Sequence, residues 1–327
     1  MGFKSIFQKE MEDYLKLRKQ ATCTATYKST QYTLQSFDEY LAMYHDGSKS
    51  VSMENVYGWI RTLYSSSYAD KTIVGKVSEL RKFLEYLRFV GFLVFMPDCP
   101  KLRDDYIPYI FSDIEISKIF HAADSILLTR NSSRYIQLEF PMLLRILYCC
   151  GLRLNEALTM RVNDILFENS VLIIRNAKNQ KQRLVPMAQE LTDILEKYCL
   201  VMRIKDRPDA FLFPGKNLEG HLSKNTALKR FQAVLKSIGI YVEPAPHTRG
   251  QCLHCFRHLF AIKSFAQAES NGCPTDESIP YLSVYMGHED MNGTAKYLKF
   301  SSDIFPEYTE MFEVYTDGIF SEVSYEE

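Results

Sequence analysis

The sequence predicts a protein of two domains that is mainly α-helical and carries one small β-hairpin. Its 327 residues correspond to roughly two domains of ~150 residues each. Residues 1–97 show only helical spacing of apolar side chains, whereas residues 112–301 combine helical segments with two short β-type runs. The charged stretch 98–111 predicts a linker between an all-helical N-terminal domain and a mixed α/β second domain, and residues 302–327 form a separate acidic tail.

The N-terminal domain is expected to be helical because its apolar residues recur every three or four positions. This spacing holds within residues 7–15 and again within residues 73–87. Five basic side chains follow the polar side of the second segment, where they form either an ordinary solvated face or a surface that contacts nucleic acid. These five are Lys71, Lys76, Arg81, Lys82 and Arg88.

The second domain is expected to begin with a helix, because Ser112 and Glu115 have the S-x-x-E spacing of a capping box. The mostly apolar run 143–150 predicts a buried helix that ends at Gly151. Alternating and β-branched residues further along the chain predict a hairpin, and the segments around it have helical spacing. The remaining expected elements are strands at 171–175 and 183–187 and helices at 188–205, 223–238, 254–268 and 276–286.

The charge of the chain is unevenly distributed. It has 39 Lys and Arg against 40 Asp and Glu, a formal charge of −1 that by itself argues against a nucleic-acid partner. The tail 302–327 contains eight acidic residues and no Lys or Arg, so residues 1–301 carry 39 basic against 32 acidic side chains, a net +7. The apolar residues of the tail fall on one face of a helix, which predicts an amphipathic helix.

No segment indicates export or a membrane anchor. No apolar run approaches the ~18 residues of a membrane span, and the N-terminus lacks an apolar signal-peptide core. The eight cysteines are therefore expected to be reduced thiols of a cytoplasmic protein. A zinc site in Cys252-Leu-His254-Cys255-Phe-Arg-His258 is disfavoured, because four candidate ligands crowd into seven residues without the second, distant pair that structural zinc usually takes.

Four short patterns in the second domain carry the chemistry. In order they are Gly151-Leu-Arg153-Leu-Asn-Glu156, the hairpin with Lys178, His254-Cys-Phe-Arg257-His258, and Gly287-His288 followed nine residues later by Tyr297. Arginine binds phosphate oxygens through paired N–H donors, histidine and lysine move protons, and tyrosine can be a covalent nucleophile. Since no Asp/Glu cluster accompanies these groups, they predict phosphoryl transfer through a phosphotyrosine, with no metal or other cofactor.

These residues resemble the catalytic set of the tyrosine recombinase (phage integrase) family, and the resemblance covers nearly the whole chain. It implies a helical core-binding domain and a mixed α/β catalytic domain that close around DNA as a C-shaped clamp. It also implies a site-specific recombinase that cleaves and rejoins DNA strands in integration, excision, resolution or transposition. The family's six catalytic positions match here as Arg153, Lys178, His254, Arg257, His288 and Tyr297, with Glu156 and residues 183–186 as matching flanks.

The resemblance implies a role for each of these residues. Tyr297 attacks the scissile phosphate, which leaves a 3′-phosphotyrosyl bond and a free 5′-hydroxyl. Arg153 and Arg257 hold the non-bridging oxygens of the phosphate. Lys178 protonates the departing 5′ oxygen, and Lys181 is the alternative residue on the same hairpin.

The two histidines of the set, His254 and His288, are expected to hydrogen-bond the phosphate and to assist proton transfer. Glu156 and His258 are expected to support them, although a surface ion pair and a packed side chain are the plainer interpretations of these two. Beside the five basic residues of the first domain, two more near the hairpin are candidate DNA contacts. These are Lys181 and Arg183.

The implied partner is double-stranded DNA carrying a specific site, and the exchange of four strands implies a homotetramer on two duplexes. The tail 302–327 is expected to join protomers by docking in trans, with docking onto its own domain as the alternative. Such an enzyme is expected in the cytoplasm, associated with the nucleoid. Two other functions stay open: a type IB topoisomerase-like enzyme that relaxes DNA, and a catalytically idle, sequence-specific DNA-binding protein of the same fold.

Overall fold

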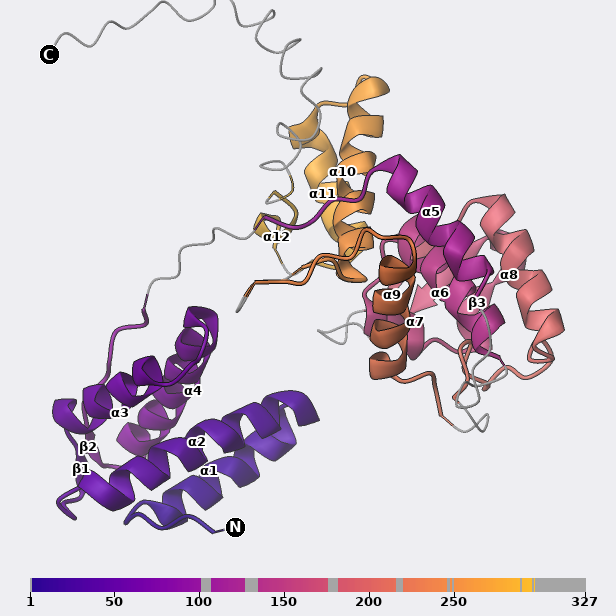
Figure 1. Cartoon of the computed structure of the whole chain (residues 1–327). Helices are drawn as coiled ribbons and strands as arrows, with labels where there is room; N and C mark the ends of the chain where they lie inside the picture. The colour runs from indigo at the N-terminus through magenta and orange to yellow at the C-terminus, as the bar shows by residue number, and fades with distance from the viewer. Residues whose placement is uncertain are drawn as a thin grey trace, which may run out of the picture. The chain divides into compact units, whose positions relative to one another are not determined.

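The chain forms two units, which are described separately. The computed structural model describes residues 2–100, 107–126, 135–175, 182–215, 220–245, 248, 250–288, 290–295 and 297. Backbone contacts divide the chain into Met1–Tyr106 and Ile107–Glu327 (Figure 1). Among the described residues, no helix is both long and apolar enough to cross a membrane.

The first unit is a bundle of four helices around an apolar core. Helices α1 (Gln8–Ala21), α2 (Thr24–Tyr44), α3 (Met53–Ser65) and α4 (Asp70–Phe89) bury one face each. The expectation of a purely helical domain was wrong in one respect, because β1 (Ser50–Val51) and β2 (Leu93–Val94) pair in parallel. Strands of two residues are too short to show an alternating pattern, which is why the sequence does not reveal them.

The second unit combines a helical layer with a small antiparallel sheet. Strands β4 (Val171–Ile174) and β5 (Arg183–Pro186) form the predicted hairpin, each one residue shorter than expected, and β3 (Ile165–Leu166) adds a strand that was not predicted. The residues that join β4 to β5 lie outside the described part at 176–181. The helices are α5 (Asp113–Asp124), α6 (Ile136–Cys150), α7 (Leu154–Leu158), α8 (Gln189–Val201), α9 (Lys224–Ser237), α10 (His254–Ser270), α11 (Thr275–Met286) and α12 (Asn292–Ala295).

The ends of these helices follow local sequence signals. The capping box predicted for α5 is confirmed: Ser112 Oγ accepts the Glu115 N–H at 3.3 Å, and Glu115 Oε2 accepts the Ser112 N–H at 2.8 Å. The helices expected at 188–205, 223–238, 254–268 and 276–286 are confirmed as α8, α9, α10 and α11, with boundaries that differ by at most four residues.

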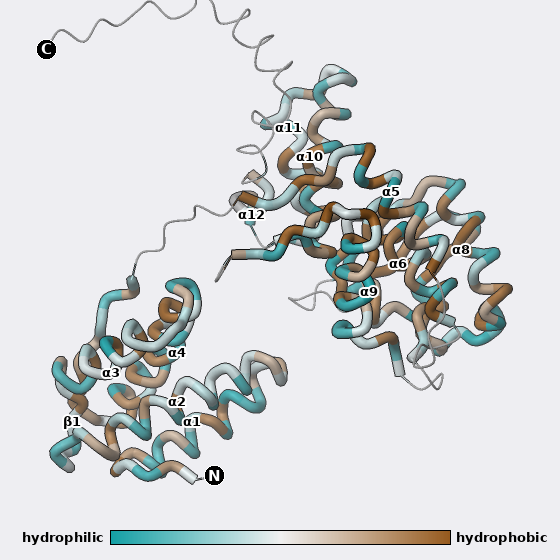
Figure 2. The backbone as a smooth tube through the Cα atoms, viewed as in Figure 1, coloured by the Kyte–Doolittle hydropathy of each residue, from teal (hydrophilic) through white to brown (hydrophobic). Residues whose placement is uncertain are grey.

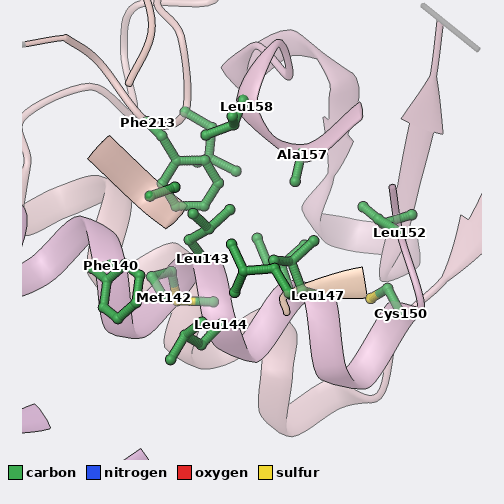
Figure 3. Close-up of a cluster of buried hydrophobic side chains, with 14 of the residues drawn as sticks. Phe140, Met142, Leu143, Leu144, Leu147, Cys150, Leu152, Ala157, Leu158 and Phe213 are labelled. Atoms are coloured by element: carbon green, nitrogen blue, oxygen red, sulfur yellow. The ribbon is translucent and has the colours of Figure 1, made fainter. Parts of the chain in front are cut away.

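The core of the second unit is built around α6, which is hydrophobic along most of its length (Figure 2). It packs against α5, α7, α8 and α10. The close-up in Figure 3 shows Leu143 and Leu147 of α6 beside Phe213 and the α7 residues Ala157 and Leu158. Because α6 is buried on nearly every side, its C-terminal end is a rigid point from which the next turn can start.

Candidate active site

The position of Arg153 is set by the way α6 ends. Gly151 adopts a left-handed conformation (φ 58°) at the helix C-cap, where glycine carries no steric penalty. A Cβ at this position would lie 2.5 Å from the Phe260 ring of α10. The turn is therefore tight against α10, and two residues later Arg153 becomes the N-cap of α7.

Glu156 is a buried carboxylate shared by two arginines. It accepts hydrogen bonds from Arg153 (Nη1, 2.9 Å; backbone N, 3.0 Å) and from Arg183 (Nη1, 3.0 Å; Nη2, 2.8 Å). Burial alone would raise the pKa of Glu156, but the hydrogen bonds and charge of Arg183, with those of Arg153, lower it to about 2. Glu156 is thus part of the interior of the site rather than a surface ion pair.

Arg183 lies inside this network rather than on an open DNA-facing surface. Its side chain is 8% exposed, and its Nε donates to the Tyr285 carbonyl at 2.8 Å. Arg183 therefore links β5 to α7 and to the end of α11. The sequence Arg-Leu-Val-Pro at 183–186 showed that Arg183 matches the family. No local signal identified its partner, Glu156, which lies 27 residues earlier.

Arg257 joins the ends of two helices. It is 1% exposed, and it donates to the Gly151 carbonyl at 2.7 Å and to the Met286 carbonyl at 2.6 Å. Helix C-termini carry unpaired carbonyls and partial negative charge, so they stabilise a guanidinium. Burial, with the charge of Arg153, lowers the pKa of Arg257 to about 10, which leaves the group cationic near neutral pH.

His288 is held as a neutral imidazole. Its Nε2 lies 3.1 Å from Arg257 Nη2, and its Nδ1 lies 2.6 Å from Thr294 Oγ1. Because a guanidinium only donates, Nε2 must accept and Nδ1 must carry the proton. Burial and the charges of Arg257, Arg153 and Arg183 lower the pKa of His288 to about 4.

Tyr297 packs beside these groups within the same chain. Its backbone N–H donates to the Thr294 carbonyl at 3.0 Å, and its ring stacks near His288 at 6.2 Å between centroids. The side chain is 5% exposed. Burial raises the pKa of Tyr297, although the charge of Arg257 and a hydrogen bond from it act in the opposite direction, so the resting group is a neutral phenol.

His254 and His258 lie on one face of α10, as their spacing of four residues requires. Their rings meet at 4.6 Å between centroids and 83°. His254 is exposed at the start of the helix, whereas His258 is buried and its ring lies 5.4 Å from that of Tyr297. His258 therefore stands between the predicted nucleophile and His254, closer to the chemistry than its sequence position alone indicated.

A cavity of about 770 Å³ opens beside Arg153 and His254. Its other wall includes the α9 side chains Lys224, Lys229 and Gln232. Helix α9 was not among the functional segments predicted from the sequence, although its basic residues alternate with apolar positions there. The cavity thus places cations and an amide next to the predicted phosphate-binding arginine.

The remaining predicted DNA contacts fall into different environments. Lys71 and Arg88 are exposed on α4, whereas Lys82 is paired with Glu79 at 2.6 Å. Lys76 lies over the Tyr68 ring at 5.0 Å, and Arg81 donates to the Pro97 carbonyl. Lys178 and Lys181 lie outside the described residues.

The described residues include no group of three or more His, Cys, Asp or Glu side chains arranged to hold a metal ion. In the cluster that raised the zinc alternative, the Cys252 and Cys255 sulfurs lie 3.8 Å apart. His258, at the other end of that cluster, faces Tyr297 instead.

Comparison with known proteins connects this geometry to a family. Residues 111–302 match the phage integrase family. Tyrosine recombinase XerA of Pyrococcus horikoshii is 24% identical over 271 residues, 82% of each chain. Tyrosine recombinase XerD of Rickettsia conorii is 25% identical over 284 residues, which cover 81% of this chain and 84% of XerD.

Solved structures share the fold. XerH site-specific recombinase bound to palindromic difH substrate, a post-cleavage complex, has a TM-score of 0.69 at 17% identity, covering 93% of this chain and 84% of that one. The Tn1549 transposon integrase in complex with transposon right end DNA has a TM-score of 0.65 at 17% identity, covering 88% and 94%. With its match over residues 111–302, the chain belongs to the phage integrase family of tyrosine recombinases, enzymes that cleave and rejoin DNA strands.

Proposed function

We propose that this site-specific recombinase cleaves DNA with Tyr297 of the same protomer, through a 3′-phosphotyrosyl intermediate and without a metal. The observation that carries the proposal is the convergence of Tyr297, His288 and Arg257 at the end of α11, where Arg257 Nη2 lies 3.1 Å from His288 Nε2. Arg153 reaches the same loop by donating to the Gly287 carbonyl at 2.9 Å. Segments distant in sequence thus supply a nucleophile, a proton carrier and two cations.

The two cations divide the work of holding a phosphate. Arg257 is buried and anchored by two carbonyls, so we assign it to an oxygen that enters the site deeply. Arg153 has a side chain that is 25% exposed and lines the cavity, so we assign it to the oxygen on the open side. Fixed guanidinium groups stabilise charge that develops on a phosphorane oxygen without having to reorganise.

Proton transfer needs groups that can change partners. Tyr297 must lose a proton that burial holds in place, and the neutral His288 has a lone pair on Nε2 that now faces Arg257. When a phosphate takes over the Arg257 donors, the Nε2 lone pair becomes free to accept the Tyr297 proton, and the resulting Nε2–H can then donate to a phosphate oxygen. We propose that His288 and His254 bind phosphate oxygens and assist this transfer, while Lys178, with Lys181 as the alternative, protonates the leaving 5′ oxygen.

DNA is proposed to lie over the cavity and along α9. The positions of Lys224 and Lys229 beside Arg153 support this path, because phosphate contacts from lysine and arginine supply most of the affinity for DNA. In the first unit, the exposed Lys71 and Arg88 of α4 are proposed as further DNA contacts. We propose that an enzyme with a DNA substrate associates with the nucleoid.

Four protomers on two duplexes are proposed to carry out the exchange, with the tail 302–327 docked in trans. The tail lies outside the described residues, so the support is its amphipathic sequence and the family. Deleting residues from Asp303 onward should reduce synapsis of two sites much more than binding to one site, as measured by gel shift. An equal loss of both, or no loss, would favour a tail that docks onto its own domain.

The central experiment is covalent trapping on a nicked DNA site, located first by footprinting DNA that flanks the gene. Wild-type protein should form the adduct in the presence of a chelator, and Tyr297→Phe should form none, whereas the exposed Tyr281→Phe should match wild type. Relaxation of supercoils without sequence preference would favour the topoisomerase alternative. Sequence-specific binding without any adduct would favour the catalytically idle alternative.

A further inference from the structure

Two cysteines flank His254 and take no part in the proposed chemistry. The sulfurs of Cys252 and Cys255 lie 3.8 Å apart. The turn between them is closed by the Cys255 N–H, which donates to the Cys252 carbonyl at 2.9 Å, and the Cys252 N–H donates to Cys255 Sγ at 3.4 Å. This tight turn ends in the first residues of α10, and His254, its exposed member, starts the helix.

We propose that Cys252 and Cys255 are an oxidisable pair, reduced at rest, whose disulfide displaces His254 and switches strand cleavage off. The effect on cleavage rests on the function proposed above, but formation of the disulfide does not. Pairs of thiols in a C-x-x-C arrangement are sites where cytosolic proteins form transient disulfides. No cysteine outside this pair needs to take part.

The two thiols differ in access, and this difference assigns their roles. Cys252 is half-buried and lines the cavity beside His254, so a small oxidant can reach it. Cys255 is buried in the core, and its hydrogen bond with Cys252, together with burial, raises the pKa of the Cys255 thiol. Cys252, which an oxidant can reach, is therefore the thiol that reacts first, and the buried Cys255 is the resolving thiol.

The reaction with hydrogen peroxide balances in two steps. The Cys252 thiolate attacks one peroxide oxygen, the O–O bond breaks, and Cys252 becomes a sulfenic acid while the other oxygen leaves as water. Cys255 then loses its proton and attacks the Cys252 sulfur, the S–O bond breaks, and a second water leaves. The two sulfurs have together lost two electrons, which the peroxide has gained.

Closing the disulfide should move the turn that carries His254. An S–S bond is about 2.05 Å long, whereas the sulfurs now lie 3.8 Å apart. Cys255 is fixed in the core of the unit, so most of the displacement falls on Cys252 and on the residues that connect it to α10. His254 is one of these residues, and its ring is 4.6 Å from that of His258, so the contact between the two histidines should break.

The test compares full-length wild type with Cys252→Ser and Cys255→Ala before and after treatment with hydrogen peroxide. In the wild type, non-reducing peptide mapping should find a Cys252–Cys255 link, and the yield of covalent DNA adduct should fall by roughly 10- to 100-fold. Dithiothreitol should restore the adduct. Both variants should keep their adduct yield in peroxide. Cys149→Ser, which changes an exposed thiol outside the pair, should behave like wild type.

A separate readout protects the inference from failure of the proposed function. The imidazole resonances of His254 should shift when the wild type is oxidised and should not shift in Cys252→Ser, whether or not the protein cleaves DNA. Absence of the Cys252–Cys255 link in oxidised wild type would overturn the inference. So would a link that forms while His254 and the adduct yield stay unchanged.

Discussion

Replacing Glu156 by Gln should destabilise the second unit and remove part of its dependence on pH. The carboxylate has a pKa lowered from 4.5 to about 2, and a difference of this size corresponds to about 3 kcal/mol of stabilisation at neutral pH. Gln fills the same space but has no charge, and its NH₂ group would face an N–H donor of Arg153 or Arg183. The side chain of Glu156 is 2% exposed, so solvent does little to screen the interactions that the substitution removes.

The sign of the pH effect follows from the lowered pKa of Glu156. The stabilisation is complete above pH 4.5 and is lost as the pH falls toward 2, because the unfolded state binds the proton first. Wild-type stability should therefore fall over this range more steeply than that of Glu156→Gln. At neutral pH the variant should be less stable by about 3 kcal/mol.

Urea denaturation followed by two signals measures this change. The single tryptophan, Trp59, lies in the first unit, so its fluorescence reports that unit, whereas far-UV circular dichroism also follows the second. Glu190→Gln, which changes an exposed carboxylate on α8, is the matched control. A loss of less than about 1 kcal/mol in Glu156→Gln, the range of an ordinary surface pair, would refute the reasoning. An unchanged acid slope would refute it as well.

Three further predictions test separate features. Glu139 is buried in α6 without a hydrogen-bond partner among the described residues, and burial raises its pKa to about 8. Its stabilisation is present below pH 4.5 and is lost as the pH rises to 8, so Glu139→Met should gain about 3 kcal/mol at pH 7 in urea denaturation. A gain that does not grow from pH 4.5 to 8 would contradict this. Thr294→Val removes the acceptor of the His288 Nδ1 proton and should lower the rate of adduct formation roughly tenfold. DNA binding, measured by gel shift, should stay unchanged, and an equal loss of binding would argue for a structural role. Gly151→Ala places a Cβ against the Phe260 ring at a position with positive φ. It should lower the stability of the second unit by about 1–3 kcal/mol, measured by calorimetry. An unchanged thermal transition would show that the turn can relax.

The candidate catalytic residues could be proposed from the sequence because each lies beside a local signal. Gly151 ends a buried apolar run and Gly287 ends α11, and both glycines have positive φ. Arg153 and His288 could therefore be located because each follows a glycine that ends a helix. Tyr297 was separated from the other tyrosines only by its distance from His288. The spacing between His254 and Arg257 placed both on the first turn of a helix.

The supporting contacts could not be predicted, because they join segments that are far apart in the chain. Arg183 was expected to contact DNA, yet its guanidinium is bound by Glu156 and by the Tyr285 carbonyl, 102 residues later. The acceptor of His288 Nδ1, Thr294, lies nearer but has no distinctive sequence context. Periodicity identifies which face of a helix is buried, but it does not identify which partner that face meets.

The charge of the site, rather than that of the chain, explains why an anion would bind here. Arg153 and Arg183 share one carboxylate, Glu156. Arg257 donates to two carbonyls and to the neutral His288, none of which carries a full negative charge. Three guanidinium groups and one carboxylate therefore leave a local excess of two positive charges. This excess is unfavourable in the free protein: burial and the charge of Arg153 lower the pKa of Arg257, and the same cations lower the pKa of His288. A phosphate would relieve both effects, and the additional negative charge of the pentacoordinate transition state would relieve them further. The unneutralised arginines therefore favour binding of the transition state over the ground state. A chain with a net charge of −1 can still bind an anion here, because the positive excess is local to the site.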